Sequence, residues 1–219
     1  MDIKDPNIFF PLLIALNIIA YLLNIGIGIS WDKILRHKTT VTKKEILSSL
    51  LTLLINITIA IPGFLLWTKG IILFSDMDLW LTFIILFLLM DFLMYFLHWA
   101  SHNIRYLKKI YLKHHEHSES FNCISLYYMS PWESILFGLL LTMVAILLPL
   151  NIYGFILFLV FNWSYGVITH LNINSDNPYF LIFTTNSFHK NHHVSFCKNY
   201  GFYTFIWDRI FNTEKNNRI

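Results

Sequence analysis

The stretch of sequence that decides the fold runs from Leu79 to His102 and reads LWLTFIILFLLMDFLMYFLHWASH. Between Leu79 and Trp99 its only charged residue is Asp91. With a rise of about 1.5 Å per residue, an α-helix over this stretch would cross the roughly 30 Å hydrocarbon core of a bilayer. An ionisable residue inside such a helix usually faces a protein interior or a functional site. The stretch therefore predicts a membrane-spanning helix whose acidic residue points inward.

Further apolar segments predict the remaining spans. Hydrophobic residues make up 56% of the 219 residues and charged residues only 13%, a balance that favours a membrane protein. The predicted spans lie near residues 8–29, 46–67, 79–99, 134–149 and 152–168. The last two belong to one uncharged stretch, which Pro149 and Asn151 break into a hairpin because a single straight helix would be too long for the bilayer. The sequence thus predicts an all-α, multi-pass transmembrane helical bundle of four to five spans, as a single membrane domain over residues 1–219.

The charges between the spans predict which side of the membrane each end of the bundle faces. Five basic residues crowd the loop after the first span, namely Lys33, Arg36, Lys38, Lys43 and Lys44. The loop after the second span carries Lys69 against Asp76 and Asp78. By the positive-inside rule the first loop is cytoplasmic, and counting spans from it places every histidine cluster in a cytoplasmic helical cap. The net charge of +3 is too small and too scattered to indicate a nucleic-acid partner.

Nine of the ten histidines lie in three short runs and at one single position beside the predicted spans. They are His98, His102, His114, His115, His117, His170, His189, His192 and His193. On a helix His98 and His102 are one turn apart and share a face, and Asp91 and Tyr95 lie on that face as well. A lone histidine such as His37 favours an ordinary structural hydrogen bond. The clustered set predicts a metal site.

The residue types limit which metal such a site can hold. Imidazoles suit iron, zinc, copper or nickel rather than magnesium or calcium. A zinc site needs about four ligands, so eight or nine histidines predict two ions, and iron and zinc both stay open on this count. Cys123 and Cys197 form no CxxC pair, which excludes a disulfide framework and a thiolate-bound iron–sulfur cluster. Asp91 is expected to orient an imidazole by accepting its second ring N–H.

Over residues 91–213 the chain resembles the fatty acid hydroxylase and sterol desaturase superfamily of membrane histidine-rich di-iron oxygenases. The motifs that carry the resemblance are DFLMYFLHWASH from Asp91, YLKHH from Tyr111, HLN from His170, FHKNHHVSFCKNYG from Phe188 and WDRIFNT from Trp207. The similarity implies that residues 91–213 are a fatty acid hydroxylase-like catalytic region. The metal ligands that it implies are His98, His102, His114, His115, His170, His189, His192 and His193.

Two departures from the family pattern concern the metal site. Tyr111 stands where the family usually has the first histidine of an HxxHH run, and Gly166 stands where some members carry another histidine. Three alternatives stay open: the ligand is absent, His117 replaces it, or Tyr111 lies beside a ligand. The residues expected as additional ligands or as neighbours of the ligands are His117, Tyr111, Asp91, Tyr95 and Asn172.

Two groups in the last part of the region, residues 199–201 and 207–209, indicate a structural role rather than a catalytic one. They read NYG and WDR. We expect them to lock the segment that follows the last histidine run and not to touch substrate.

The resemblance implies a lipid C–H hydroxylase that uses two non-haem iron ions and takes O2 as cosubstrate, with a fatty acyl, sterol or related lipid as substrate. It also implies an external electron donor, of the cytochrome b5, ferredoxin or reductase type, and an endoplasmic reticulum or bacterial inner membrane location. A lipid desaturase with the same centre is the alternative within the family. A non-catalytic metal-binding membrane transporter or sensor is the alternative from another class, although transport would place the ligands nearer the bilayer midplane.

Overall fold

The computed structural model describes residues 3–111, 114–116, 121–173, 179–195 and 197–215 of the chain. In chain order its elements are α1 (Pro6–Ile34), α2 (Lys43–Thr58), α3 (Ala60–Thr68), α4 (Leu79–Asn103), α5 (Arg105–Tyr111), the 3₁₀ turns η1 (His114–Glu116) and η2 (Ser125–Tyr127), α6 (Pro131–Leu147), α7 (Ile152–Thr169), β1 (Tyr179–Phe180), β2 (Phe183–Thr184), α8 (Asn186–Ser195) and α9 (Ile206–Ile210). The two strands form a small antiparallel hairpin, which the sequence did not predict.

The predicted all-α, multi-pass fold is confirmed. Among the described residues, four helical segments are long and apolar enough to cross a membrane: α1, the α2–α3 segment, α4 and α7. The fifth predicted span corresponds to α6, a shorter apolar helix of 17 residues. The chain is therefore an integral membrane protein whose helices account for all the predicted spans.

Capping and proline chemistry set the ends of these helices. The Asp78 carboxylate caps the start of α4, and the Asn151 amide oxygen caps the start of α7, so the predicted break between the last two spans is confirmed. The span predicted over residues 46–67 is divided at Ile59 into α2 and α3. Pro62 explains the division, because it lacks the N–H group that would bond to the carbonyl of Thr58.

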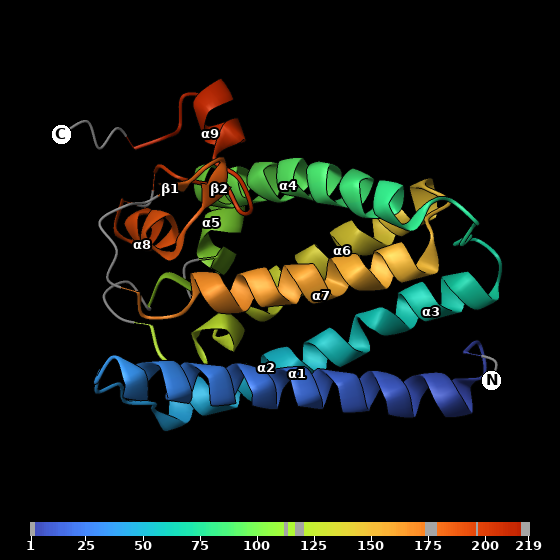
Figure 1. The fold of residues 1–219 in the computed structure, drawn as a ribbon, viewed down its shortest axis with the longest axis horizontal. Helices are drawn as coiled ribbons and strands as arrows, with labels where there is room; N and C mark the ends of the chain where they lie inside the picture. The colour runs from blue at the N-terminus through green and yellow to red at the C-terminus, as the bar shows by residue number, and fades with distance from the viewer. Residues whose placement is uncertain (1–2, 112–113, 117–120, 174–178, 196, 216–219) are drawn as a thin grey trace.

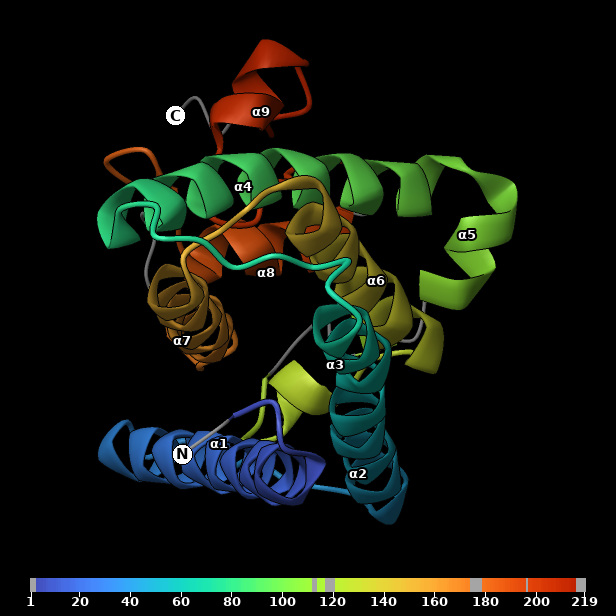
Figure 2. The ribbon, with the colours of Figure 1, turned by 90° about the vertical axis from the view of Figure 1, so that its right-hand side faces the viewer.

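The helix pair α4 and α7 forms the centre of the bundle. The two helices approach closely at Gly154, where an added Cβ would lie 2.8 Å from the Cβ of Thr82. Figure 2 shows α4 and α1 on opposite sides of the molecule, with α3, α6 and α7 between them. The buried cluster of the core consists of Leu86, Met90, Met94, Val144, Leu150, Phe158 and Tyr203. Tyr203 brings the C-terminal segment into this core.

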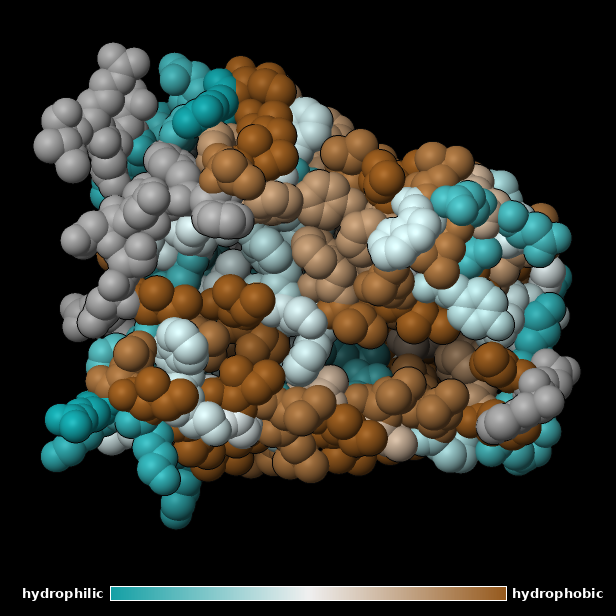
Figure 3. Space-filling model, in the orientation of Figure 1, coloured by the Kyte–Doolittle hydropathy of each residue, from teal (hydrophilic) through white to brown (hydrophobic). Residues whose placement is uncertain are grey.

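The two ends of the bundle differ in what they carry. In Figure 1 the last turns of α4 and α7 lie at the same end as α5 and α8, while the α3–α4 and α6–α7 connections lie at the other end. On the face shown in Figure 3, hydrophobic residues cover the middle of the molecule and hydrophilic residues gather toward its two ends. Such a band is the surface expected of a protein that spans a bilayer. All the histidine runs thus meet at one end of the spans.

Candidate metal centre

Four buried histidines from three separate elements converge at this end. They are His98 and His102 on α4, His115 in η1 and His192 on α8, and each offers a ring nitrogen within 4.8 Å of the others. We call these four residues the first cluster. The one-turn spacing of the pair on α4 places both rings on the same side of the helix, as predicted from the sequence.

The Nε2 atoms of the first cluster face one another. The Nε2 atom of His192 lies 2.9 Å from that of His98 and 3.2 Å from that of His115. The Nε2 atoms of His102 and His115 are 3.1 Å apart. Two nitrogens that bind one ion at about 2.1 Å and at right angles lie about 3.0 Å apart. The four donors therefore have the spacing of ligands to a common metal ion.

The opposite ring nitrogens fix the protonation of two of these histidines. The Nδ1 atom of His98 is 2.9 Å from the carbonyl oxygen of Tyr200, and that of His192 is 2.7 Å from the carbonyl oxygen of Lys198. A carbonyl oxygen only accepts, so each Nδ1–H must donate and each neutral ring presents a lone pair at Nε2. Two lone pairs 2.9 Å apart repel each other, and a cation between them converts the repulsion into attraction. The donor set of this site thus fits a bound metal.

Burial keeps the imidazoles outside the membrane spans in the neutral form that binds metal. It lowers the pKa of His115 from 6.5 to about 3, with a smaller contribution from the neighbouring His102. Burial also lowers the pKa of His192 well below its ordinary value, assisted by the other imidazoles around it. Desolvation disfavours the charged imidazolium in both cases. At neutral pH these rings are ready to act as ligands.

A second cluster lies directly beside the first. It consists of His170, which follows α7, and of His189 and His193 on α8. The Nε2 atoms of His189 and His193 are 3.1 Å apart, and the ring centroids of His170 and His189 are 4.8 Å apart. The Nδ1 atom of His170 is 2.7 Å from the carbonyl oxygen of Gly166. The rings of His115 and His193, 4.5 Å apart, connect the two clusters.

The structure thus brings together seven of the eight histidines that the resemblance implies as ligands. Of the eighth, His114, the backbone lies in η1, but its side chain is outside what the structure describes. His117 and the side chain of Tyr111 are also outside the described residues, so the alternatives for the Tyr111 position stay open.

The expectation that Asp91 orients an imidazole is wrong. One carboxylate oxygen accepts the backbone N–H groups of Tyr203 and Thr204, each at 3.0 Å. The other accepts the Thr204 hydroxyl at 2.6 Å and the indole N–H of Trp207 at 3.0 Å. Within the described part of the chain its hydrogen bonds go to the C-terminal segment and none goes to a histidine. A buried carboxylate needs several donors, and this segment supplies them.

Tyr95 and Asn172 also lie beside the site rather than in it. The hydroxyl of Tyr95 is 2.9 Å from that of Thr213, so this side chain holds the C-terminal segment as Asp91 does. The Asn172 side chain accepts the N–H of Phe121 at 3.1 Å and donates to the carbonyl of the same residue. It therefore positions Phe121, whose ring centroid lies 5.5 Å from that of His193 and 5.4 Å from that of His170.

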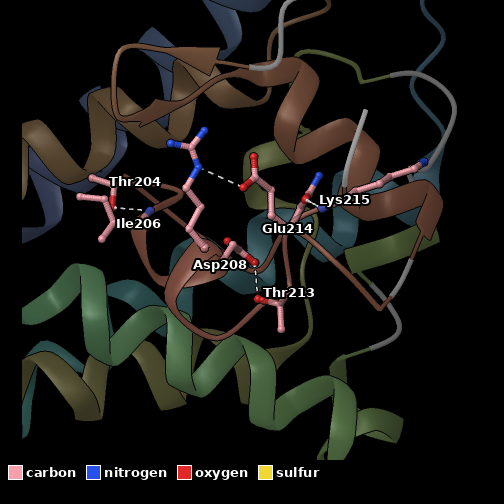
Figure 4. A network of polar contacts seen from close by, with 8 residues as sticks. Thr204, Ile206, Asp208, Thr213, Glu214 and Lys215 are labelled. Carbon is pink, nitrogen blue, oxygen red and sulfur yellow. Dashed lines mark hydrogen bonds and ion pairs between the residues drawn. The ribbon is translucent and has the colours of Figure 1, made fainter. Parts of the chain in front are cut away.

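The predicted lock in the segment after the last histidines is confirmed. The carboxylate of Asp208 accepts the backbone N–H groups of Tyr200 at 2.8 Å and of Gly201 at 2.6 Å, and the hydroxyl of Thr213 at 2.7 Å. Figure 4 shows the bond between Asp208 and Thr213 within this polar network. Because the carbonyl of Tyr200 accepts from His98, the lock also fixes a metal-facing ring. Sequence reasoning missed this link, since backbone carbonyls leave no mark in a sequence.

Comparison with known proteins agrees with the resemblance. The model of the family described as fatty acid hydroxylase matches residues 83–213, more than half of the chain and all the residues of both clusters. Methylsterol monooxygenase 1 from Danio rerio is 28% identical to the chain over 128 residues, which are 55% of this chain and 42% of that protein. The matched part thus spans less than half the length of this relative. No solved structure matches the chain.

Proposed function

Since the chain belongs to the fatty acid hydroxylase family, we propose that it is a membrane lipid hydroxylase that takes O2 as cosubstrate and holds two non-haem irons. The observation that carries the proposal is the pair of Nε2 lone pairs of His98 and His192, which face each other at 2.9 Å in a buried site. With each Nδ1–H donated to a backbone carbonyl, both Nε2 atoms carry lone pairs, and a cation bound between them would offset their repulsion. The similarity to a methylsterol monooxygenase supports a lipid as the substrate.

The proposed ligands fall into two sets, one in each cluster. His98, His102, His115 and His192 would hold one iron, and His170, His189 and His193 would hold the other, with His114 as the eighth ligand. When bound, a pair of irons supplies the redox chemistry with O2 that breaking an unactivated C–H bond requires. Electrons would come from a separate carrier of the cytochrome b5, ferredoxin or reductase type.

The chain itself contributes orientation and a dry environment. The carbonyls of Lys198 and Tyr200 hold the Nδ1 protons of His192 and His98, which aims both Nε2 atoms inward. The ring of Phe121 packs on the second cluster and limits access of water there. The basic loop over residues 31–45 begins in the last turn of α1, at the same end as the clusters, which supports a cytoplasmic location of the site.

The proposal is tested by lipid mass spectrometry of cells grown in ¹⁸O-labelled oxygen. We expect one lipid to gain the label with the wild-type chain and to lose it with the His192→Ala, His193→Ala double variant. The matched control is His37→Ala, which removes a histidine of the basic loop and should leave labelling unchanged. A labelled lipid that persists in the double variant, or a wild-type chain that binds two metals yet labels no lipid, would contradict the proposal.

A further inference from the structure

A partly open cavity of about 330 Å³ lies where α7 meets the β1–β2 hairpin and the start of α8. The same elements carry the second cluster: Ile168, in the cavity wall, lies two residues before His170, and Asn186 lies one turn before His189. The Asn186 amide donates to the carbonyl of Thr169 at 2.8 Å, which ties α8 to the end of α7. The cavity and the second cluster therefore share their supporting backbone.

The apolar part of the cavity lining is continuous with the lipid-facing surface. It includes Ile168, Ile173 and Phe183. Ile168 stands in the last turn of α7 and is 54% exposed, and Val160, two turns earlier, is 55% exposed. A predicted span that exposes such residues exposes them to lipid, not to water. The apolar part of the cavity lining is thus an extension of the surface that α7 presents to the bilayer.

The tip of the β1–β2 hairpin, which adjoins the cavity, is also apolar. Its two turn residues, Leu181 and Ile182, are 78% and 46% exposed. Leu181 has a φ of 57°, a left-handed conformation that turns normally give to glycine or asparagine. A large apolar residue at an exposed turn position is costly in water. Insertion of the tip among lipid chains removes this cost and places the cavity at the bilayer surface.

The polar part of the lining is neutral. It includes the hydroxyl-bearing residues Tyr165, Thr184, Thr185 and Ser187 and the amide of Asn186. None of the described residues that line the cavity carries a charge. A carboxylate or phosphate placed here would lose water without gaining a counter-charge, whereas a hydroxyl group can exchange hydrogen bonds with these side chains.

We propose that this cavity binds the hydroxyl-bearing end of a neutral lipid, which reaches it from the bilayer along α7. The site would prefer a lipid alcohol over a fatty acid or a phospholipid. The inference rests on the proposed function in one respect, because it takes this lipid to be the substrate of the neighbouring clusters.

The test measures binding without turnover. The full chain in phosphatidylcholine nanodiscs, with no iron or reductant added, is photolabelled with octadecanol that carries a diazirine group near its hydroxyl end. Unlabelled octadecanol should compete about tenfold better than octadecanoate, and the label should map to residues 165–187. Equal competition by both compounds, or label spread evenly over the lipid-facing helices, would overturn the inference.

Two matched variants sharpen the result. Ile173→Trp fills the cavity and should reduce labelling severalfold, whereas Ile156→Trp adds the same ring at an exposed position of α7 outside the cavity and should leave labelling unchanged. Undiminished labelling of a folded Ile173→Trp variant counts against the cavity. If that variant does not fold, the map of the wild-type label decides. Because no iron is needed, a failure here is distinct from a failure of the ¹⁸O experiment.

Discussion

At the scale of single residues, the site depends on imidazoles that burial keeps neutral. His115 has a pKa of about 3, and that of His192 is also far below 6.5. Protons therefore do not compete for these two ligands until the pH falls well below 6. We expect the affinity for Co²⁺ to change less than about tenfold between pH 8 and pH 6, whereas two imidazoles with a pKa of about 6.5 would lose more than that.

This pH dependence can be followed by the visible absorption of bound Co²⁺ in the metal-free chain, titrated at each pH. A loss of affinity much larger than tenfold by pH 6 would show that the rings protonate as ordinary solvent-exposed histidines do.

Gly201 is a second residue on which the site depends. An added Cβ would lie 2.7 Å from the Asp208 carboxylate oxygen and would also collide with the carbonyl oxygen of Thr204. Gly201→Ala should therefore lower the free energy of unfolding by about 2 kcal/mol or more and weaken metal binding through Tyr200. The matched control is Gly26→Ala on α1, where an added Cβ meets nothing within 4 Å. Thermal unfolding and metal content measure both effects, and equal behaviour of the two variants would contradict the expectation.

At the scale of elements, α4 serves two purposes with a single face. Asp91 and Tyr95 bind the C-terminal segment, and His98 and His102, farther along the same face, reach the first cluster. The four residues predicted to share a face of this helix thus have two different roles. Only His98 and His102 point at the candidate metal site. The other two hold the segment that completes the site.

The division of this face predicts the effect of Asp91→Asn. An amide has only one acceptor oxygen and presents an NH₂ group to the remaining donors, so the variant should lose about 2–4 kcal/mol of stability. Once folded, it should keep the metal content of the wild type, because the carboxylate contacts none of the described histidines. Thermal unfolding and metal analysis test this, with Asp76→Asn in the α3–α4 loop as the control. Loss of metal at unchanged stability would instead return Asp91 to the metal site.

At the scale of the whole molecule, a metal held by the first cluster would join three separate elements of the fold. The first cluster takes its donors from α4, η1 and α8. A bound ion stabilises the folded state by an amount that grows with its affinity, about 4 kcal/mol at a concentration 1,000 times the dissociation constant. We expect metal removal to lower the melting temperature and to raise amide hydrogen exchange over residues 186–213.

The control for this measurement lies in the same molecule. Exchange over α1, which contributes no residue to either cluster, should change little when the metal is removed. A uniform increase over the whole chain would mean that the ions stabilise the fold globally and do not act as a local cross-link.

The sequence was sufficient to predict the spans and the gathering of the histidines, because both follow from local patterns. Hydrophobic length defines a span, and one-turn spacing places His98 beside His102. The sequence was not sufficient to predict the hydrogen-bond partners of Asp91. These lie more than 110 residues later and are set by the docking of the C-terminal segment. The carbonyls of Lys198 and Tyr200 were also beyond prediction, since every residue has one and only the fold selects which of them face a ring.

The distance in sequence between His98 and its partners has a consequence for how the protein is made. Its helix enters the membrane early in translation, but His192 follows 94 residues later, and Asp208, which fixes the Tyr200 carbonyl, later still. No binding site for the ion exists on the ribosome-bound chain until synthesis has passed these residues. Insertion of the spans would therefore precede metal loading, and a cell short of the proposed metal would accumulate a fully inserted but empty protein.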